Sequence, residues 1–469
     1  MLMGIRLKAQ PSDHQKLILS QWMGCARFIW NAKCEENKYL TKFAQKYMPL
    51  QTYAPIDQTY SQYKNPELSP WLKHCPSQIL RNSAVNWFNT YQKFLDKECG
   101  KPKRKKKSGK GSIHITKEIF KFEVCSDGIT RLFIGSKTNN IGYLSFKSHR
   151  DFETPKSIYI TKKSGHYWVS FCYQDDFDES NLRTQSQTLD YLRGASREFL
   201  EAHTVGIDRG VIRPVQAGNE VFDLTLPQKR KKKKKEAYLK RCQRRLSRQK
   251  KGSKRRCKTK HKISRAHEKI ANIRKDFCHK TSRKIVDNPQ TKVIVLEDLR
   301  TKNMTATPKA KKMADGKWEK NGSKAKAGLN RSILDQGWHQ LETFIKYKSY
   351  RAGKVWFKIS AYQTSQECAV CGHTHPDNRK TQSKFLCGSC GHSANADFNS
   401  AEVIKKRTIR LILDPGTGLS DRGVLLEGTG RGAMVKSRQA KASRACGNEA
   451  SKKKRTAAEM PLSIGSSVL

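Results

Sequence analysis

The sequence predicts a multidomain α+β protein: a small β-barrel with a helical unit, then a mixed α/β domain that carries an inserted zinc ribbon. Three observations predict this class. Short β-rich runs between residues 120 and 173 alternate with turns, which is typical of small barrels. After residue 186, apolar strands alternate with helical stretches. Two C-x-x-C pairs then follow close together.

The N-terminal part predicts one strand and two helices. Residues 1–10 read as a short strand that ends at Pro11, and Ser12 and Gln15 form the pattern of a capping box. The helical unit spans residues 11–110 and closes with a basic loop. Its aromatic residues are interpreted as core rather than as base-stacking platforms. The apolar residues that recur at helical spacing are Leu17, Met23, Ala26, Trp30, Cys34, Ile79, Leu80, Ala84, Trp87, Phe88, Tyr91 and Leu95.

The barrel is expected to comprise residues 1–10 and 111–185, which makes the helical unit an insertion between its strands. The segment 162–165, Lys-Lys-Ser-Gly, is a hairpin signal between two of these strands. The other expected strands are separated by Gly, Asp or Ser turns. The β-rich runs are residues 120–124, 129–134, 141–146, 157–161 and 167–173.

The α/β domain is expected to comprise residues 186–363 and 394–407, with the ribbon at 364–393 between them. A buried strand at 204–208 ends in Asp208, and a second apolar strand at 292–296 is followed by Glu297. The remaining elements are a meander at 213–217 and 221–224, a long basic helical region at 230–286, a helix at 329–350 and a strand at 355–359. Low-complexity residues 301–328 are expected to be mobile, and 408–469 to be a disordered basic tail.

The charge of the chain indicates its partner. Lys and Arg number 94 against 41 Asp and Glu, a net charge of +53, and nucleic acid is the obvious polyanion to balance it. The run from Lys229 to Lys235 is interpreted as contacting phosphates rather than as a merely solvated segment. The sequence contains no apolar run of about 18 residues, so no membrane span is expected. The lack of a signal-peptide pattern and ten scattered cysteines without framework spacing predict a cytoplasmic protein with reduced thiols.

Four cysteines predict a structural zinc site. Cys368, Cys371, Cys387 and Cys390 form two C-x-x-C knuckles, each followed by a glycine that lets the backbone turn under a metal. The alternatives are two unmetallated turns or two disulfides, but paired knuckles at this spacing favour zinc. Four thiolates leave no open position for water, so the ion would be structural. The nearby histidines are interpreted as polar loop residues: His373, His375 and His392.

Three carboxylates stand out by position. Asp208 and Glu297 each end an apolar strand, and Asp397 opens the helix after the cysteines. Each alone would be an ordinary strand-end or cap residue, but their strand, strand, helix order favours one shared site. Hard oxygen ligands suit Mg²⁺, and two such ions can support phosphodiester cleavage. Asp298 is left out, because strand alternation places it on the face opposite Glu297.

Five segments resemble the TnpB family, the RNA-guided nucleases of insertion-sequence transposons, which are related to compact type V CRISPR effectors. Four resemble its signatures: Gly206–Gly210, Leu296–Leu299, Thr364–Gly372 and Asp397–Ala401. Gly24–Asn31 is similar to the opening helix of the family, and the resemblance spans residues 1–405 in consistent order. It implies an RNase H-like (RuvC) nuclease domain with a zinc ribbon before its last helix, and a wedge β-barrel interrupted by a helical recognition domain.

The resemblance also implies a site and partners. Asp208, Glu297 and Asp397 would be the magnesium ligands, the partner a guide RNA from the transposon end, and the substrate double-stranded DNA beside a short adjacent motif. Arg209 and Ala396 depart from the residues usual in the family, but neither change removes a ligand. The expected activity is RNA-guided DNA cleavage in the cytoplasm of a prokaryotic cell, with the protein associated with the nucleoid when it is bound to DNA. The alternatives are a guided DNA-binding repressor, a DNA-joining transposase and a general RNA-binding zinc protein.

Overall fold

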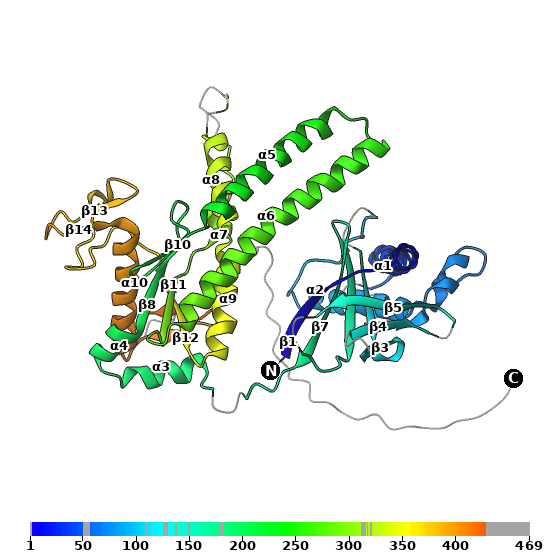
Figure 1. The fold of residues 1–469 in the computed structure, drawn as a ribbon, viewed down its shortest axis with the longest axis horizontal. Helices are drawn as coiled ribbons and strands as arrows, with labels where there is room; N and C mark the ends of the chain where they lie inside the picture. The colour runs from blue at the N-terminus through cyan, green and yellow to red at the C-terminus, as the bar shows by residue number, and fades with distance from the viewer. Residues whose placement is uncertain are drawn as a thin grey trace.

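The structure is a computed structural model that describes residues 2–49, 57–107, 111–124, 130–136, 138–148, 151–178, 182–310, 316, 318 and 321–427. The chain forms two bodies that lie side by side in Figure 1. The first body ends with the strand at residues 166–174, and the second begins with the helix at residue 185. This arrangement is mixed α+β and multidomain, as the sequence predicts.

A seven-stranded antiparallel sheet forms the first body, in the order β2-β6-β7-β1-β5-β4-β3. β1 pairs with β7 over its whole length, which confirms that the N-terminal strand joins this sheet. β2 is an additional strand that the sequence does not predict, and no described residues of β2 pair with β3 to close the expected barrel. The strands are β1 (Leu2–Ala9), β2 (Gly111–Thr116), β3 (Phe120–Val124), β4 (Thr130–Gly135), β5 (Asn140–Lys147), β6 (Ser157–Lys163) and β7 (His166–Gln174).

Two long helices pack on this sheet, α1 (Asp13–Tyr47) and α2 (Ser77–Leu95). The predicted capping box is confirmed: the Gln15 N–H donates to Ser12 Oγ at 3.2 Å, and the Ser12 N–H donates to Gln15 Oε1 at 3.0 Å. The predicted apolar pattern is wrong at its first and last residues, Leu17 of α1 and Leu95 of α2, and Leu95 is 42% exposed. Leu17 is 58% exposed, because it lies about half a turn away from the fully buried Leu19.

The second body is built on a five-stranded sheet in the order β10-β9-β8-β11-β12. β8, β11 and β12 are parallel, while β9 and β10 continue from β8 as an antiparallel meander. The five strands predicted by the sequence are confirmed to within two residues at each end. They are β8 (Thr204–Asp208), β9 (Val215–Ala217), β10 (Glu220–Phe222), β11 (Val293–Glu297) and β12 (Val355–Ile359).

Helices cover both faces of this sheet, which is why β11 is an unbroken apolar run. Val293 and Val295 face a core shared with α3 (Gln185–Arg193), α4 (Arg197–His203) and α10 (Ala396–Leu413). Ile294 and Leu296 face the opposite core, shared with α6 (Lys254–Asp287) and α9 (Trp338–Arg351). In Figure 1, α10 and α9 accordingly lie on opposite sides of the sheet.

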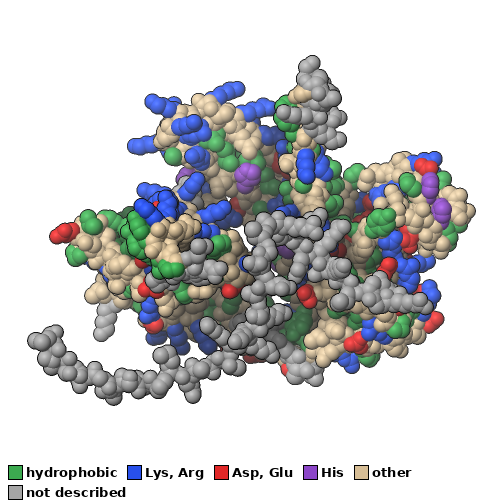
Figure 2. Space-filling view, turned by 180° about the vertical axis from the view of Figure 1, so that it is seen from behind, with side chains coloured by type: hydrophobic (Ala, Val, Ile, Leu, Met, Phe, Trp, Pro, Cys, Tyr) green, Lys and Arg blue, Asp and Glu red, His purple; other side chains and the backbone are tan. Residues whose placement is uncertain are grey.

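The basic helical region is a pair of antiparallel helices, α5 (Leu226–Arg248) and α6, rather than one. The run from Lys229 to Lys235 lies within α5 and is helical. α6 has a buried apolar stripe that includes Ala266, Ile270 and Phe277. Figure 2 shows Lys and Arg side chains gathered over the hairpin, which projects at the upper left. Among the described helices, none combines the length and apolar composition that a membrane crossing needs.

Two predictions for the C-terminal half are wrong. The helix expected at 329–350 is two helices, α8 (Ser323–Gln336) and α9, separated by Gly337 in the left-handed conformation with φ of 72°. α8 and the short α7 (Thr301–Met304) also lie partly within residues 301–328, which the sequence predicts to be mobile. Part of that segment, residues 311–315, 317, 319 and 320, lies outside the described residues.

The prediction of a disordered tail from residue 408 is wrong for residues 408–427. α10 continues to Leu413, and β15 (Gly418–Leu419) and β16 (Leu425–Leu426) follow it. The helix continues because buried Ile409, Leu411 and Ile412 extend its apolar stripe. The Lys358 N–H donates to the Gly423 carbonyl at 2.7 Å, which ties this segment to β12. Residues 428–469 lie outside the described part of the chain.

Candidate active site and metal centre

Two neighbouring parallel strands end in carboxylates. Ile207 of β8 is paired with Leu296 of β11, so the next residues along the two strands are Asp208 and Glu297. Carboxyl ends of adjacent parallel strands meet at one edge of a sheet, where ligand sites commonly lie. The register therefore brings together two of the three carboxylates that the sequence singles out.

The third carboxylate arrives on α10, which packs across β8. Asp397 lies in the first turn of α10 and is 7% exposed. The Asn395 side chain caps this helix, because its Oδ1 accepts hydrogen bonds from the Asp397 N–H at 3.1 Å and the Phe398 N–H at 3.4 Å. Close approach of α10 depends on Gly206 of β8, where a Cβ would lie 2.1 Å from the Ala401 carbonyl oxygen.

Replacing Gly206 with Ala is therefore expected to displace α10 and with it Asp397. The added Cβ meets backbone atoms of α10, the Ala401 oxygen and the Lys405 nitrogen at 2.8 Å, which cannot move as a flexible side chain would. Overpacking of this kind costs about 1–3 kcal/mol of stability or more. Thermal unfolding should show the loss. Gly4→Ala in β1 is the matched control, since its Cβ would meet nothing within 4 Å, and equal losses for both variants would contradict the prediction.

The three carboxylates raise the proton affinity of the site. Burial, together with the charges of Glu297 and Asp397, raises the pKa of Asp208 to about 7. Burial also raises the pKa of Glu297, although a hydrogen bond from Thr364 opposes that rise. Repulsion of this kind among carboxylates is relieved by a cation, and carboxylate oxygens are ligands that divalent metal ions accept.

Neighbouring side chains fix the orientation of Glu297. Thr364 donates from Oγ1 to Glu297 Oε1 at 2.5 Å, and both residues are buried. Arg209 Nη2 donates to the Glu297 backbone carbonyl at 2.5 Å. The Arg209 guanidinium lies 3.5 Å from Glu342 of α9, which also pairs with Lys358 at 2.6 Å and with Lys346 at 3.1 Å. Arg209 therefore contacts the Glu297 backbone from a buried position and shares the single Glu342 carboxylate with two lysines.

Asp298 lies apart from this cluster. Its carboxylate forms ion pairs with Lys358 at 3.4 Å and with Arg422 at 3.5 Å. It therefore faces a structural network of opposite charges. The placement agrees with its exclusion by strand alternation.

Arg379 is a site residue that the sequence did not indicate. It ends a short 3₁₀ helix, η4 (Pro376–Arg379), between the two cysteine knuckles, and its Nη2 lies 3.2 Å from Asp397 Oδ1. Its positive charge opposes the upward pKa shifts of Asp208 and Glu297. A single arginine in an irregular loop has no periodicity that could reveal it, and only the folded loop shows that it reaches the carboxylates.

Arg379→Gln is expected to lower turnover about 10- to 100-fold, because it removes a positive charge from a site where phosphate charge would develop. Arg379→Lys should recover part of the loss, since it keeps the charge. Single-turnover cleavage rates measure the effect, and exposed Lys380→Gln is the matched control for loss of one charge in the same loop. A loss of the same size in the Lys380 variant would argue for general electrostatics instead.

The four cysteines form one group that could hold a metal ion. Their sulfur atoms all lie within 4.8 Å of one another, and two of the separations are 3.7 Å (Cys368 to Cys390) and 3.6 Å (Cys371 to Cys387). Four sulfurs placed about 2.3 Å from a central ion at tetrahedral angles would be about 3.8 Å apart. A disulfide needs about 2.05 Å, so the alternative of two disulfides does not fit.

The backbone of both knuckles supports this geometry. Gly372 and Gly391 have φ of 76° and 71°, as the sequence predicts, and each donates its N–H to the carbonyl of the first cysteine of its knuckle. A hydrogen bond from the Cys390 N–H is the main cause that lowers the pKa of the Cys387 thiol to about 7. That shift favours the thiolate, the form that binds metal.

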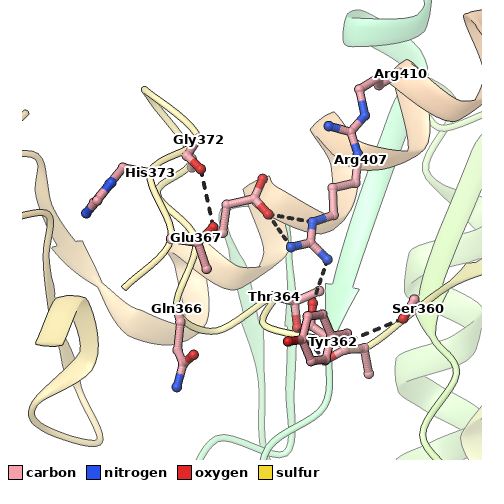
Figure 3. A network of polar contacts seen from close by, with 12 residues as sticks. Ser360, Tyr362, Thr364, Gln366, Glu367, Gly372, His373, Arg407 and Arg410 are labelled. Carbon is pink, nitrogen blue, oxygen red and sulfur yellow. Dashed lines mark hydrogen bonds and ion pairs between the residues drawn. The ribbon is translucent and has the colours of Figure 1, made fainter. Parts of the chain in front are cut away.

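The ribbon is tied to the active-site helix by several polar contacts, part of which Figure 3 shows. Arg407 of α10 pairs with Glu367 and donates to the Tyr362 carbonyl at 2.7 Å. Asn399 donates to the Glu367 carbonyl at 2.7 Å and accepts from the Ala369 N–H at 3.0 Å. The strand β14 (Ser393–Asn395) pairs with β13 (Lys384–Leu386) and leads directly into α10. Folding of the ribbon therefore positions Asp397 and Arg379.

Three family profiles match the chain. One described as "Probable transposase" (OrfB_IS605) covers residues 188–307, and one described as "Cas12f1-like, TNB domain" covers residues 338–404. Together they contain the three carboxylates and the four cysteines. A profile described as "Helix-turn-helix domain" covers residues 1–40, which in the structure form β1 and most of α1.

Curated relatives match nearly the whole chain. It is 31% identical over 409 residues to the putative RNA-guided DNA endonuclease InsQ of Escherichia coli (strain K12), covering 86% of this chain and 91% of that protein. It is 24% identical over 399 residues to a putative RNA-guided DNA endonuclease of Streptomyces pristinaespiralis, covering 84% and 86% of the two chains.

The fold also has a relative among solved structures. A cryo-EM structure of a Cas12f1–sgRNA–target DNA complex matches over 86% of this chain and 98% of that chain, with a TM-score of 0.50 and 13% identity. That likeness concerns the fold alone. Together with the transposase profile and the identity to InsQ, the matches show that this chain belongs to the TnpB family of IS605-type transposons.

Proposed function

We propose that this protein is an RNA-guided DNA endonuclease of an IS605-type transposon. The observation that carries the proposal is the convergence of Asp208, Glu297 and Asp397 from β8, β11 and α10 in a chain of net charge +53. The names of the two curated relatives support the same activity. A general RNA-binding protein has no use for three clustered carboxylates, whose mutual repulsion is costly.

The second body is proposed to be an RNase H-like (RuvC) nuclease domain. Support comes from the sheet order, in which an antiparallel meander adjoins three parallel strands, and from acidic residues at the ends of two adjacent parallel strands. The first body would be the wedge and recognition part that holds nucleic acid. The guide of the protein would be an RNA from the transposon end, and the target would be double-stranded DNA with a short adjacent motif.

Asp208, Glu297 and Asp397 would hold magnesium, with two ions as the expected number. Bound magnesium would supply a Lewis acid for the phosphate and an activated water. The chain's own residues do the positioning: Thr364 orients Glu297, the Asn395 cap fixes the start of the helix that carries Asp397, and Arg379 places a positive charge beside it. The four cysteines would bind a structural zinc ion, consistent with their sulfur separations.

The test uses protein purified from cells that carry the adjoining transposon sequence. The RNA that copurifies is sequenced, its guide segment is reprogrammed, and the complex is incubated with target DNA flanked by randomised sequence, with Mg²⁺ or with EDTA. Magnesium-dependent cuts beside one short motif are expected. Motif-specific binding without cuts would instead indicate a guided repressor, joined products would indicate a transposase, and no discrete RNA would overturn guidance.

A further inference from the structure

The outer end of α1 carries three exposed aromatic side chains in a row. Tyr39, Phe43 and Tyr47 are 68%, 45% and 63% exposed and recur every four residues, so they lie along one face of the helix. The ring centroids of Tyr39 and Phe43 are 6.5 Å apart, and those of Phe43 and Tyr47 are 5.0 Å apart. We call these three residues the aromatic ladder.

The aromatic ladder lies beyond the hydrophobic core of its own domain. The core cluster that includes α1 takes no residue of the helix after Ile29, and Ala44 is the one apolar residue after position 37 that is buried. Contiguous exposed aromatic surface is costly in water and marks interaction sites in soluble proteins. Contacts between rings four residues apart stabilise an isolated helix by only about 0.2–0.5 kcal/mol per pair, which does not account for three large exposed rings.

The charges beside the aromatic ladder are positive. Lys38, Lys42 and Lys46 are exposed and each precedes one ring, and the Lys46 ammonium lies 4.9 Å from the centroid of Tyr47. The sequence contains no Asp or Glu from residue 37 to residue 56. Aromatic rings interleaved with cations are the features that bind single-stranded nucleic acid, since rings stack on bases and lysines contact phosphates.

The spacing of the rings also fits an unstacked strand. Four residues of α-helix advance about 6 Å, so successive rings are roughly twice as far apart as the ~3.4 Å steps along one strand of a stacked duplex. A duplex buries its base faces and cannot use such a surface. An extended single strand can place one base against each ring.

We propose that the aromatic ladder is a stacking platform for a single-stranded segment of RNA. The choice of RNA over DNA rests on the proposed function, in which DNA must enter the carboxylate site of the second body, whereas the aromatic ladder belongs to the body that carries α1 (Figure 1). Binding of nucleic acid by this surface needs no cleavage and no magnesium. Its test can therefore fail while the nuclease proposal stands, and the reverse also holds.

The first experiment measures binding of the full chain, freed of copurifying RNA, to a fluorescent, unstructured RNA of about 12 nucleotides. The variant Tyr39→Leu, Phe43→Leu, Tyr47→Leu keeps apolar side chains of high helix propensity but removes every ring. We expect affinity to fall about tenfold per ring, and the dependence on salt to stay unchanged because no charge is lost. Affinity for a blunt duplex should not change.

Two matched variants separate stacking from charge and from folding. Lys38→Gln, Lys42→Gln, Lys46→Gln should keep the rings but lower the salt slope by about 2. Leu17→Ala, at an exposed position of the same helix, should bind RNA as the unmodified protein does. Unchanged RNA affinity in the triple leucine variant would overturn the proposal, as would an equal loss of duplex binding.

Two further experiments test whether the bound strand is RNA or DNA, and whether a second copy of the chain covers the aromatic ladder instead. A photo-crosslinking amino acid at position 39, in complex with guide RNA and target DNA, is expected to label RNA, and labelling of DNA alone would overturn the assignment to RNA. Light scattering then tests whether a second copy of the chain covers the rings. A drop from dimer to monomer in the triple leucine variant, with RNA affinity kept, would make the aromatic ladder a protein interface instead.

Discussion

Replacing Asp208 with Asn is expected to abolish DNA cleavage, by about a thousandfold or more, while RNA binding and guided DNA binding persist. Asn is nearly isosteric, so the fold should be kept, but the site loses one of the three carboxylates proposed to hold magnesium. Cleavage and gel-shift assays on the same preparation measure the two outcomes. Cleavage at the original rate would remove Asp208 from the proposed ligand set.

The same substitution is expected to stabilise the metal-free protein at pH 8. The folded-state pKa of Asp208 is raised from its usual 3.8 to about 7, so the fold loses stability as pH rises from about 4 to about 7, and the loss is complete at pH 8. The free energy of unfolding should rise by about 1–3 kcal/mol in the variant. This is less than the whole pKa shift would give at 1.36 kcal/mol per pKa unit, because the side chain is partly exposed. Thermal unfolding without divalent ions should therefore show a higher midpoint for the variant.

A neighbouring carboxylate provides the control. Asp298→Asn changes the residue next to Glu297, but Asp298 pairs with Lys358 and Arg422 rather than with the cluster. Cleavage by this variant should stay within a few-fold of the original rate. Divalent ions should raise the unfolding midpoint of the unmodified protein and of the Asp298 variant more than that of the Asp208 variant, and an equal rise in all three would contradict the proposed site.

Loss of the ribbon metal should have the second large effect. In Cys390→Ser, one of the four sulfurs is gone, and the protein is expected to hold no tightly bound zinc and to lose cleavage at least a hundredfold. The reason is structural: Arg379 lies within the ribbon, and Ala396, which opens α10, donates its N–H to the Ser383 carbonyl of the ribbon at 2.9 Å. An unfolded ribbon would release both Arg379 and the first turn that carries Asp397.

Zinc content by metal analysis and cleavage rate are measured together. Cys257→Ser, at an exposed cysteine of α6, should keep both. Full cleavage without zinc in the Cys390 variant would show that the ribbon does not position the site. Brief EDTA treatment followed by Mg²⁺ should restore cleavage by the unmodified protein, since a four-thiolate site holds zinc more firmly than carboxylates hold magnesium.

Local pattern was sufficient for much of the fold. β8, β11 and β12 are short, mostly apolar runs, and a sequence containing such runs predicts buried strands. The capping box at Ser12 and the glycines after each cysteine knuckle are local rules, and both hold. The break at Gly337 and the strand β2 were missed because a flexible glycine within a helical pattern and a strand beside a basic loop carry little local signal.

The end of α10 shows a different limit. Residues beyond 407 are rich in Gly and charge overall, which suggested a tail, yet Ile409, Leu411 and Ile412 are buried against the sheet. Whether such a short apolar stretch finds a partner depends on β12 and α3, far away in the chain. The overall composition of residues 408–469 is dominated by the many other residues, so it does not reveal these three apolar side chains.

The sequence by itself determined the strand ends that carry Asp208 and Glu297, the helix start that carries Asp397 and the two cysteine knuckles, because each is set by residues close together in the chain. The tertiary structure decided what surrounds them. It showed that Arg379 reaches Asp397, that Thr364 holds Glu297, and that Glu342 pairs with Arg209. These contacts join residues from 18 to 133 positions apart, and only the packing of the whole domain brings such residues together.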